Sequence, residues 1–210
     1  MASLKDIRKR IDSVKRTQKT TSAMKMVSAA KLRRSEENIK RATPYGVKLK
    51  RIVSSLSQRF NEEEQDSGFG RLFRSKDGKR TGVILVTSDR GLCGGFNANL
   101  SKALARKLEK EGVDSAEFII IGRKGNDFYK RTKHTILQNH IGTHPEEQLQ
   151  LVRNIVSELT KRFEDNELDQ VILAYNHFIS VISQEPVIEK LLPIKAPEVI
   201  LRNEKRMLQE

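Results

Sequence analysis

The first sixty residues carry an apolar repeat whose spacing alternates between three and four. It keeps its phase for about eight heptads from Leu4, which predicts a long helix with a coiled-coil seam. Its apolar seam positions are Leu4, Ile7, Ile11, Val14, Leu32, Ile39, Leu49, Val53 and Leu56. Ser3 and Asp6 have the spacing of a capping box, so we expect the helix to begin near residue 3. The phase continues across Pro44, which favours a kink over a break.

The middle of this seam is polar. Its core-type positions there are Gln18, Thr21, Lys25 and Ser28, whereas Met24, Met26 and Val27 lie off the seam. A helix with so narrow an apolar stripe is not stable alone in water, so it needs a partner strand. The patch around Met24 indicates a second neighbour, with a solvated helix and incidental methionines as the alternative.

From residue 81 onward, short apolar runs alternate with helical periodicity. The pattern predicts strands at 81–87, 117–121, 136–141, 169–175 and 179–192, and helices at 97–111, 124–133 and from Pro145 to Phe163. The last helix is predicted to bury Leu149, Val152, Ile155, Val156, Leu159 and Phe163. We place the turn of the final hairpin at Asn176–His177. This alternation predicts an α/β fold with a mainly parallel sheet and room for an antiparallel edge.

The chain therefore divides into four segments. These are a basic coiled-coil helix (1–60), a polar linker or exposed loop (61–80), an α/β domain (81–195) and an atypical tail (196–210).

The net charge of +13 lies on the helix, because residues 1–60 hold 17 Lys and Arg against 4 Asp and Glu, whereas the remaining residues hold 23 of each. This asymmetry predicts an acidic partner: nucleic acid, anionic lipid or an acidic protein surface. Nucleic acid is disfavoured. The basic residues surround the helix instead of preceding the heptads, and Tyr45 and Phe60 are the only aromatic residues in the segment.

The glycine cluster Gly91–Gly95 follows a predicted strand and precedes a predicted helix, where phosphate cradles occur. Its spacing fits no phosphate-binding motif, so a structural turn is favoured over nucleotide binding. The single Cys93 excludes an internal disulfide and indicates a reducing compartment. The histidines at 134, 140 and 144 are a weak metal pattern. We therefore predict no catalytic residue, metal or cofactor.

Three segments carry a family resemblance: Ile7–Ile11 with Thr17–Arg34, Ser88–Asn97, and Ser183–Pro186 followed by Leu191–Pro193. The first two together closely resemble the gamma subunit of F-type ATP synthase. The similarity extends from about residue 3 to residue 195.

The resemblance implies a non-catalytic rotor shaft that couples proton flow through the c-ring to ATP synthesis on the beta subunits. Its helix would pair with a C-terminal helix inside a ring of alpha and beta subunits. A Rossmann-like central domain would lie near the membrane, against epsilon and the c-ring. Met24 and Lys25 would contact the alpha and beta ring. A structural turn facing that ring would comprise Arg90, Gly91, Leu92, Cys93, Gly94 and Gly95.

The family typically continues well beyond Glu210 with the helix that pairs with residues 3–60. We therefore expect either a shortened gene product or a second shaft helix supplied by another chain. The start of the chain has no secretory signal or transit peptide, which favours a peripheral location on the cytoplasmic face of a bacterial membrane. A nucleic-acid-binding protein and a nucleotide-binding α/β enzyme are the alternatives.

Overall fold

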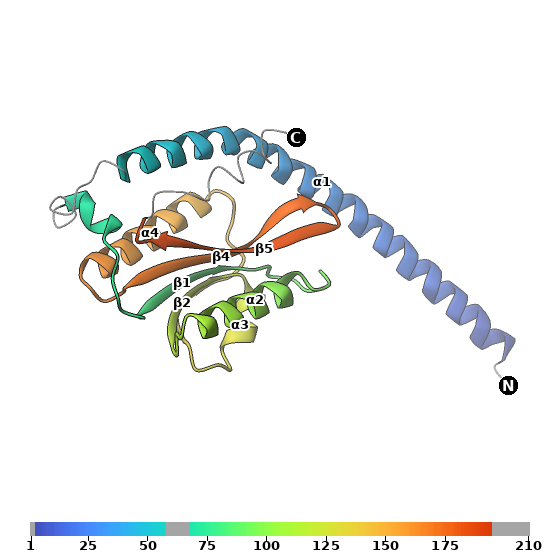
Figure 1. The fold of residues 1–210 in the computed structure, drawn as a ribbon. Helices are drawn as coiled ribbons and strands as arrows, with labels where there is room; N and C mark the ends of the chain where they lie inside the picture. The colour runs from blue at the N-terminus through green and yellow to red at the C-terminus, as the bar shows by residue number, and fades with distance from the viewer. Residues whose placement is uncertain (1–2, 58–67, 195–210) are drawn as a thin grey trace. The chain divides into compact units, whose positions relative to one another are not determined.

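The computed structural model describes residues 3–57 and 68–194 (Figure 1). The chain divides into two compact units, with the boundary between Ser54 and Ser55. The expected tail at 196–210 and the first part of the expected linker, 61–67, lie outside the described residues.

Helix α1 (Leu4–Ser57) has 54 residues, and all but its last three belong to the N-terminal unit. The predicted capping box is confirmed. The backbone N–H of Ser3 donates to Asp6 Oδ2 over 3.3 Å, and the N–H of Lys5 donates to Ser3 Oγ over 3.3 Å. The helix continues through Pro44, as its unbroken phase predicted, and Figure 1 shows one continuous ribbon.

The second unit contains one five-stranded sheet in the order β3-β2-β1-β4-β5. Its strands are β1 (Thr81–Val86), β2 (Ala116–Ile121), β3 (Thr135–His140), β4 (Gln170–Ser180) and β5 (Ser183–Leu192). The first four are parallel, and β5 pairs antiparallel with β4. The predicted α/β fold with a mainly parallel sheet is therefore confirmed.

Helices cover both faces of this sheet (Figure 1). They are α2 (Phe96–Lys110), α3 (Arg123–Tyr129) and α4 (Gln148–Glu164), with a short 3₁₀ helix, η2 (Gly68–Phe73). Because side chains alternate along a strand, Val83 and Leu85 pack with α2 and α3, whereas Ile84 packs with α4. This alternation produces two apolar layers that fix the strand ends from both sides.

At three places the observed boundaries differ from the predicted ones by three residues or more. The hairpin turns at Val181–Ile182 instead of Asn176–His177, because Asn176 and His177 pair with Pro186 and Glu185 of β5 and β4 continues to Ser180. Helix α3 ends at Tyr129 instead of residue 133, since the N–H of Thr132 turns back to Tyr129 O.

Helix α4 begins at Gln148, not Pro145, and buries a narrower face than predicted. Ile155, Leu159 and Phe163 are buried at intervals of four residues, which keeps one stripe on the sheet. The other three predicted core residues, Leu149, Val152 and Val156, are exposed. Inside the expected linker, the Leu72 side chain of η2 is buried, and the Leu72 carbonyl accepts from the N–H of Ile194.

A buried carboxylate anchors the start of β1. Asp169 Oδ1 accepts from Arg80 Nη2 over 2.7 Å, while Oδ2 accepts from Arg80 Nε (3.0 Å) and from the Arg80 backbone N–H (2.9 Å). These bonds, the side-chain ones foremost, lower the pKa of Asp169. Arg80 is exposed and Asp169 is buried, so the carboxylate depends on this pairing.

Asp169→Asn should therefore lower the free energy of unfolding at pH 7 by roughly 2 kcal/mol, because the Arg80 donors lose a charged acceptor. A carboxyl whose folded pKa is depressed stabilises the protein above its unfolded pKa of about 3.9. That contribution is lost as pH falls through the folded pKa. Urea denaturation of both proteins at pH 7 and at pH 3 should show the difference shrinking in acid; a constant difference would contradict this assignment.

Candidate functional site

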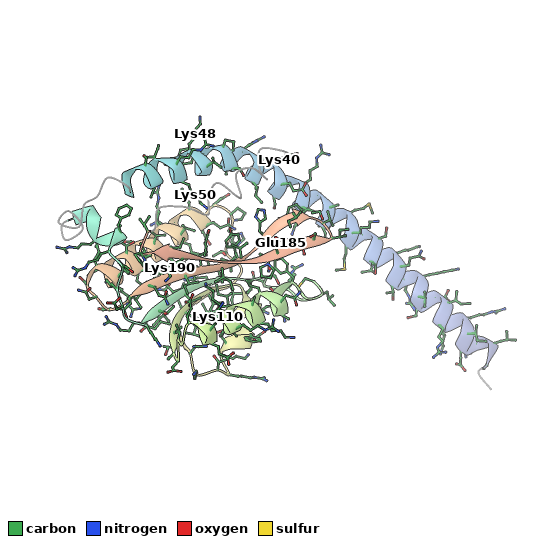
Figure 2. All side chains as sticks on the ribbon, in the orientation of Figure 1. Lys40, Lys48, Lys50, Lys110, Glu185 and Lys190 are labelled. Carbon is green, nitrogen blue, oxygen red and sulfur yellow. The ribbon has the colours of Figure 1, made fainter. Side chains whose placement is uncertain are left out.

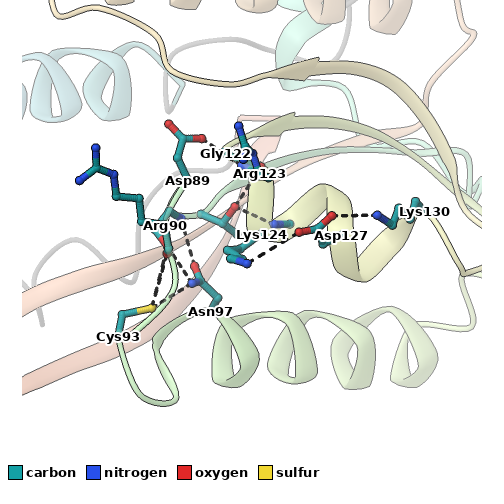
Figure 3. Close-up of polar contacts among 12 residues, drawn as sticks. Asp89, Arg90, Cys93, Asn97, Gly122, Arg123, Lys124, Asp127 and Lys130 are labelled. Atoms are coloured by element: carbon teal, nitrogen blue, oxygen red, sulfur yellow. Dashed lines mark hydrogen bonds and ion pairs between the residues drawn. The ribbon is translucent and has the colours of Figure 1, made fainter. Parts of the chain in front are cut away.

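Three connecting loops meet at the carboxyl edge of the parallel strands. They follow β1 (Ser88–Gly95), β2 (from Gly122) and β3 (from Ile141). The carboxyl ends of parallel strands lie at one edge of a sheet, which is where α/β proteins place their functional residues. The first of these loops contains the glycine cluster of the sequence (Figure 3).

The loop from Arg90 to Gly95 is exposed throughout. Leu92 has φ 63° and Gly94 has φ 55°, so two of its residues adopt the left-handed conformation. Glycine accepts this conformation freely, whereas leucine is strained by it. The side chain of Leu92 is 102% exposed, which places a large apolar group fully in solvent.

Asn97, near the start of α2, closes the loop from one side. Its Oδ1 accepts from the N–H of Ser88 (3.0 Å), and its Nδ2 donates to Ser88 Oγ (2.8 Å) and Cys93 Sγ (3.1 Å). Ser88 Oγ donates in turn to Arg90 O over 2.6 Å. One asparagine therefore connects the start of the loop, at Ser88, to Cys93 further along it.

Asp89 ties the same loop to its two neighbours. Its Oδ1 accepts from the backbone N–H of Arg123 (3.0 Å), and its Oδ2 accepts from the N–H of Gly142 (2.9 Å). Figure 3 shows this carboxylate reaching the start of α3. The sequence pattern by itself predicts no role for Asp89 or Asn97. An aspartate and an asparagine flanking a glycine cluster are a recognisable signal for such turn bonds.

Three amides beside the loop, at the starts of α2 and α3, donate within the protein. The N–H of Phe96 donates to Cys93 O, that of Asn99 to Gly95 O, and that of Lys124 to Ser88 O. A phosphate cradle needs free N–H groups directed at its ligand. These three amides are therefore committed to bonds within the protein, which agrees with a structural turn.

The histidine pattern does not assemble a ligand set. His134 Nδ1 accepts from the N–H of Ala116 (3.2 Å), and burial with the nearby Lys133 lowers its pKa. His140 Nε2 lies 2.9 Å from Gln138 Oε1. Across 3–57 and 68–194, no three His, Cys, Asp or Glu side chains gather into a group that could hold a metal ion.

Helix α1 displays its predicted seam to solvent. Leu4, Ile7, Ile11 and Val14 are exposed by 77%, 47%, 47% and 67%. Ile39 and Leu49 are exposed as well, Leu32 and Val53 are half-buried, and the side chain of Leu56 lies outside the described residues.

The off-seam patch of α1 is also exposed at Met24, Met26 and Val27, as is Lys25. Lysines such as Lys40 and Lys48 project from the same helix (Figure 2). No described helix is both long and apolar enough to cross a membrane.

Comparison with known proteins decides the family. Residues 3–210 match the family described as ATP synthase. The ATP synthase gamma chain of Desulfitobacterium hafniense is 39% identical over 204 residues, covering 97% of this chain and 70% of the relative. That of Geotalea daltonii is 44% identical over 200 residues, covering 94% of this chain and 68% of the relative. The chain belongs to the ATP synthase gamma chain family.

One solved structure supports the fold of this gamma-family chain. The rotor of the Euglena gracilis mitochondrial ATP synthase matches with a TM-score of 0.51 at 15% identity, covering 96% of this chain and 64% of that one. The resemblance stated from Ile7–Ile11, Thr17–Arg34 and Ser88–Asn97 is thereby confirmed. The relatives give no support to a nucleic-acid-binding protein or a nucleotide-binding enzyme.

Proposed function

We propose that this chain is a central-stalk subunit of an F-type ATP synthase, which couples proton flow through the c-ring to ATP synthesis on the beta subunits. Membership of the gamma chain family carries the proposal. The matching Euglena protein is described as a rotor. A 54-residue helix with an exposed apolar row suits a shaft, which must pack along its length against other chains.

The proposed partners are the alpha and beta ring, the epsilon subunit and the c-ring, with no nucleic acid and no small-molecule substrate. Both quoted relatives are bacterial, which supports a peripheral place on the cytoplasmic face of a bacterial cell membrane. The seam from Leu4 to Val53 would pair with a second helix, because its apolar side chains lose contact with water only through such a neighbour.

The subunit itself would be non-catalytic. The glycine spacing of the loop fits no phosphate-binding motif, and the N–H groups of Phe96, Asn99 and Lys124 beside it donate within the protein. The Arg90–Gly95 turn would face the alpha and beta ring and serve as a contact element. Rotation of an asymmetric shaft would then change nucleotide affinity on the beta subunits, and by reciprocity ATP hydrolysis would turn the shaft.

Met24 and Lys25 are the proposed ring contacts on α1. Met24→Lys should reduce the number of protons pumped per ATP hydrolysed by roughly fivefold. The new lysine would form an ionic contact with an acidic beta segment, and a contact of about 1 kcal/mol corresponds to a change of this size. Proton pumping and ATP hydrolysis should be measured together in membrane vesicles. Met24→Gln, which is similar in length but uncharged, is the matched control and should couple nearly as the wild type. Unchanged pumping in Met24→Lys would refute the contact.

Co-purification tests the proposal as a whole. A tagged chain, expressed with the other subunits, should bring down alpha and beta in a fixed ratio. Recovery of the chain alone would contradict the proposed function. Tight ATP binding by the isolated chain would indicate an enzyme, and retention on DNA with a steep salt dependence would indicate a nucleic-acid-binding protein.

A further inference from the structure

The Arg90–Gly95 loop holds an unfavourable conformation at its tip. Leu92 adopts φ 63° although its side chain is wholly exposed, so no packing of that side chain stabilises the strained backbone. A strained residue persists only where the surrounding structure imposes its conformation. The source of that constraint must lie in the polar framework beneath the loop.

Asp89 is the part of that framework that reaches furthest. Its two carboxylate oxygens accept from two backbone N–H groups, those of Arg123 and Gly142, which lie 34 and 53 residues away in the sequence. The first begins α3 after β2, and the second follows β3. One side chain therefore connects the loops after three adjacent parallel strands.

The other side of the loop is held by Asn97, whose amide group contacts both Ser88 and Cys93. This bridge fixes the loop to α2 but does not connect it to β2 or β3. The N–H of Lys124 does bond to Ser88 O, over 3.1 Å, but this bond lies before the loop tip. Asp89, which directly precedes Arg90, is thus the residue best placed to orient Arg90 and Leu92 against the sheet.

We propose that Asp89 is a positioning residue for the Arg90–Gly95 loop. Its carboxylate clamps three strand ends together, so that force applied to Arg90 and Leu92 reaches the parallel sheet instead of bending the loop. This inference rests on the proposed function, because the loop transmits force only if the chain works as a rotor. The clamp itself is a property of the chain alone and is measured separately.

Asp89→Asn in the assembled complex tests this role. Asparagine keeps the shape but presents one acceptor oxygen, so one of the two amides loses its partner. Hydrogen exchange at Arg123 or Gly142 should accelerate about tenfold, the size expected when a bond to a charged acceptor is lost. Protons pumped per ATP hydrolysed should fall roughly threefold while hydrolysis continues, since a loosened loop bends under load.

Asp114→Asn is the matched control. It makes the same change of charge at a carboxylate that is 99% exposed and paired with Lys133 over 3.5 Å. It should leave both amide exchange and coupling unchanged. The thermal midpoint of each variant should also be measured, so that general unfolding is distinguished from a loosened loop.

The outcomes separate the two levels of the proposal. Faster exchange with lost coupling in Asp89→Asn, and neither in Asp114→Asn, supports the positioning role. Full coupling despite faster exchange in Asp89→Asn overturns the positioning role, and so does unchanged exchange. Both results leave the proposed rotor function intact. Equal uncoupling in both variants also overturns the positioning role, because charge alone would then explain the effect. Failure of the wild-type chain to join the complex refutes the proposed function itself.

Discussion

Gly122→Ala is expected to lower the free energy of unfolding of the α/β domain by at least about 3 kcal/mol. This loss has two sources, the strain of a positive φ at alanine and the overpacking caused by the added Cβ. Gly122 has φ 104° and follows β2 directly. A Cβ there would lie 2.2 Å from the backbone oxygen of Thr87 and 2.7 Å from its carbonyl carbon. Atoms this close cannot coexist, so part of the backbone must move.

Neither backbone segment is free to move. The N–H of Thr87 donates to Ile121 O over 2.8 Å, and the N–H of Gly122 donates to His140 O over 2.8 Å. The Thr87 hydroxyl also accepts from the N–H of Gly125 over 2.9 Å. Relief of the clash therefore breaks bonds that hold the ends of three strands together.

Urea denaturation of the full chain, followed by circular dichroism, measures this effect. Gly94→Ala is the matched control, because Gly94 also has a positive φ, 55°, but no atom lies within 4 Å of the added Cβ. It should cost only about 1–2 kcal/mol, the strain of the left-handed conformation alone. Equal losses in the two variants would show that the contact with Thr87 contributes nothing.

The strands and helices of the domain could be predicted because each has a hydrophobic pattern within its own segment of the sequence. The run Thr81–Val86 and the Leu100, Leu104 and Leu108 stripe of α2 are patterns complete within one element. The predicted position of the hairpin turn is wrong because it also rests on local composition. Asn176–His177 has turn composition, whereas the true turn, Val181–Ile182, is built from β-branched residues that ordinarily favour strands.

Only part of the candidate site could be predicted from the sequence. A turn at Gly91–Gly95 follows from glycine chemistry at a strand-to-helix junction. The partners of Asp89 do not, because they are backbone amides 34 and 53 residues away that only the strand order brings near. Likewise, the periodicity predicts the seam of α1 and its need for a partner helix. It does not identify that partner.

The exposed apolar row of α1 should make the isolated chain associate with itself. When this chain is studied by itself, the helicity of residues 3–57 should rise with protein concentration, because the exposed seam can be buried only against another helix. Ile7→Asp with Ile11→Asp should abolish this dependence. Each buried isoleucine contributes about 1.5–3 kcal/mol, so losing two weakens association by at least about a hundredfold.

Far-UV circular dichroism and sedimentation, each over a wide range of concentration, would measure the effect. Ser13→Asp with Thr20→Asp is the matched control, because it adds the same two charges at exposed positions away from the seam. It should retain the concentration dependence. A stable helical monomer at every concentration would contradict the interpretation of α1 as a shaft helix. The helix would then need no partner along its seam at Leu4, Ile7, Ile11 and Val14.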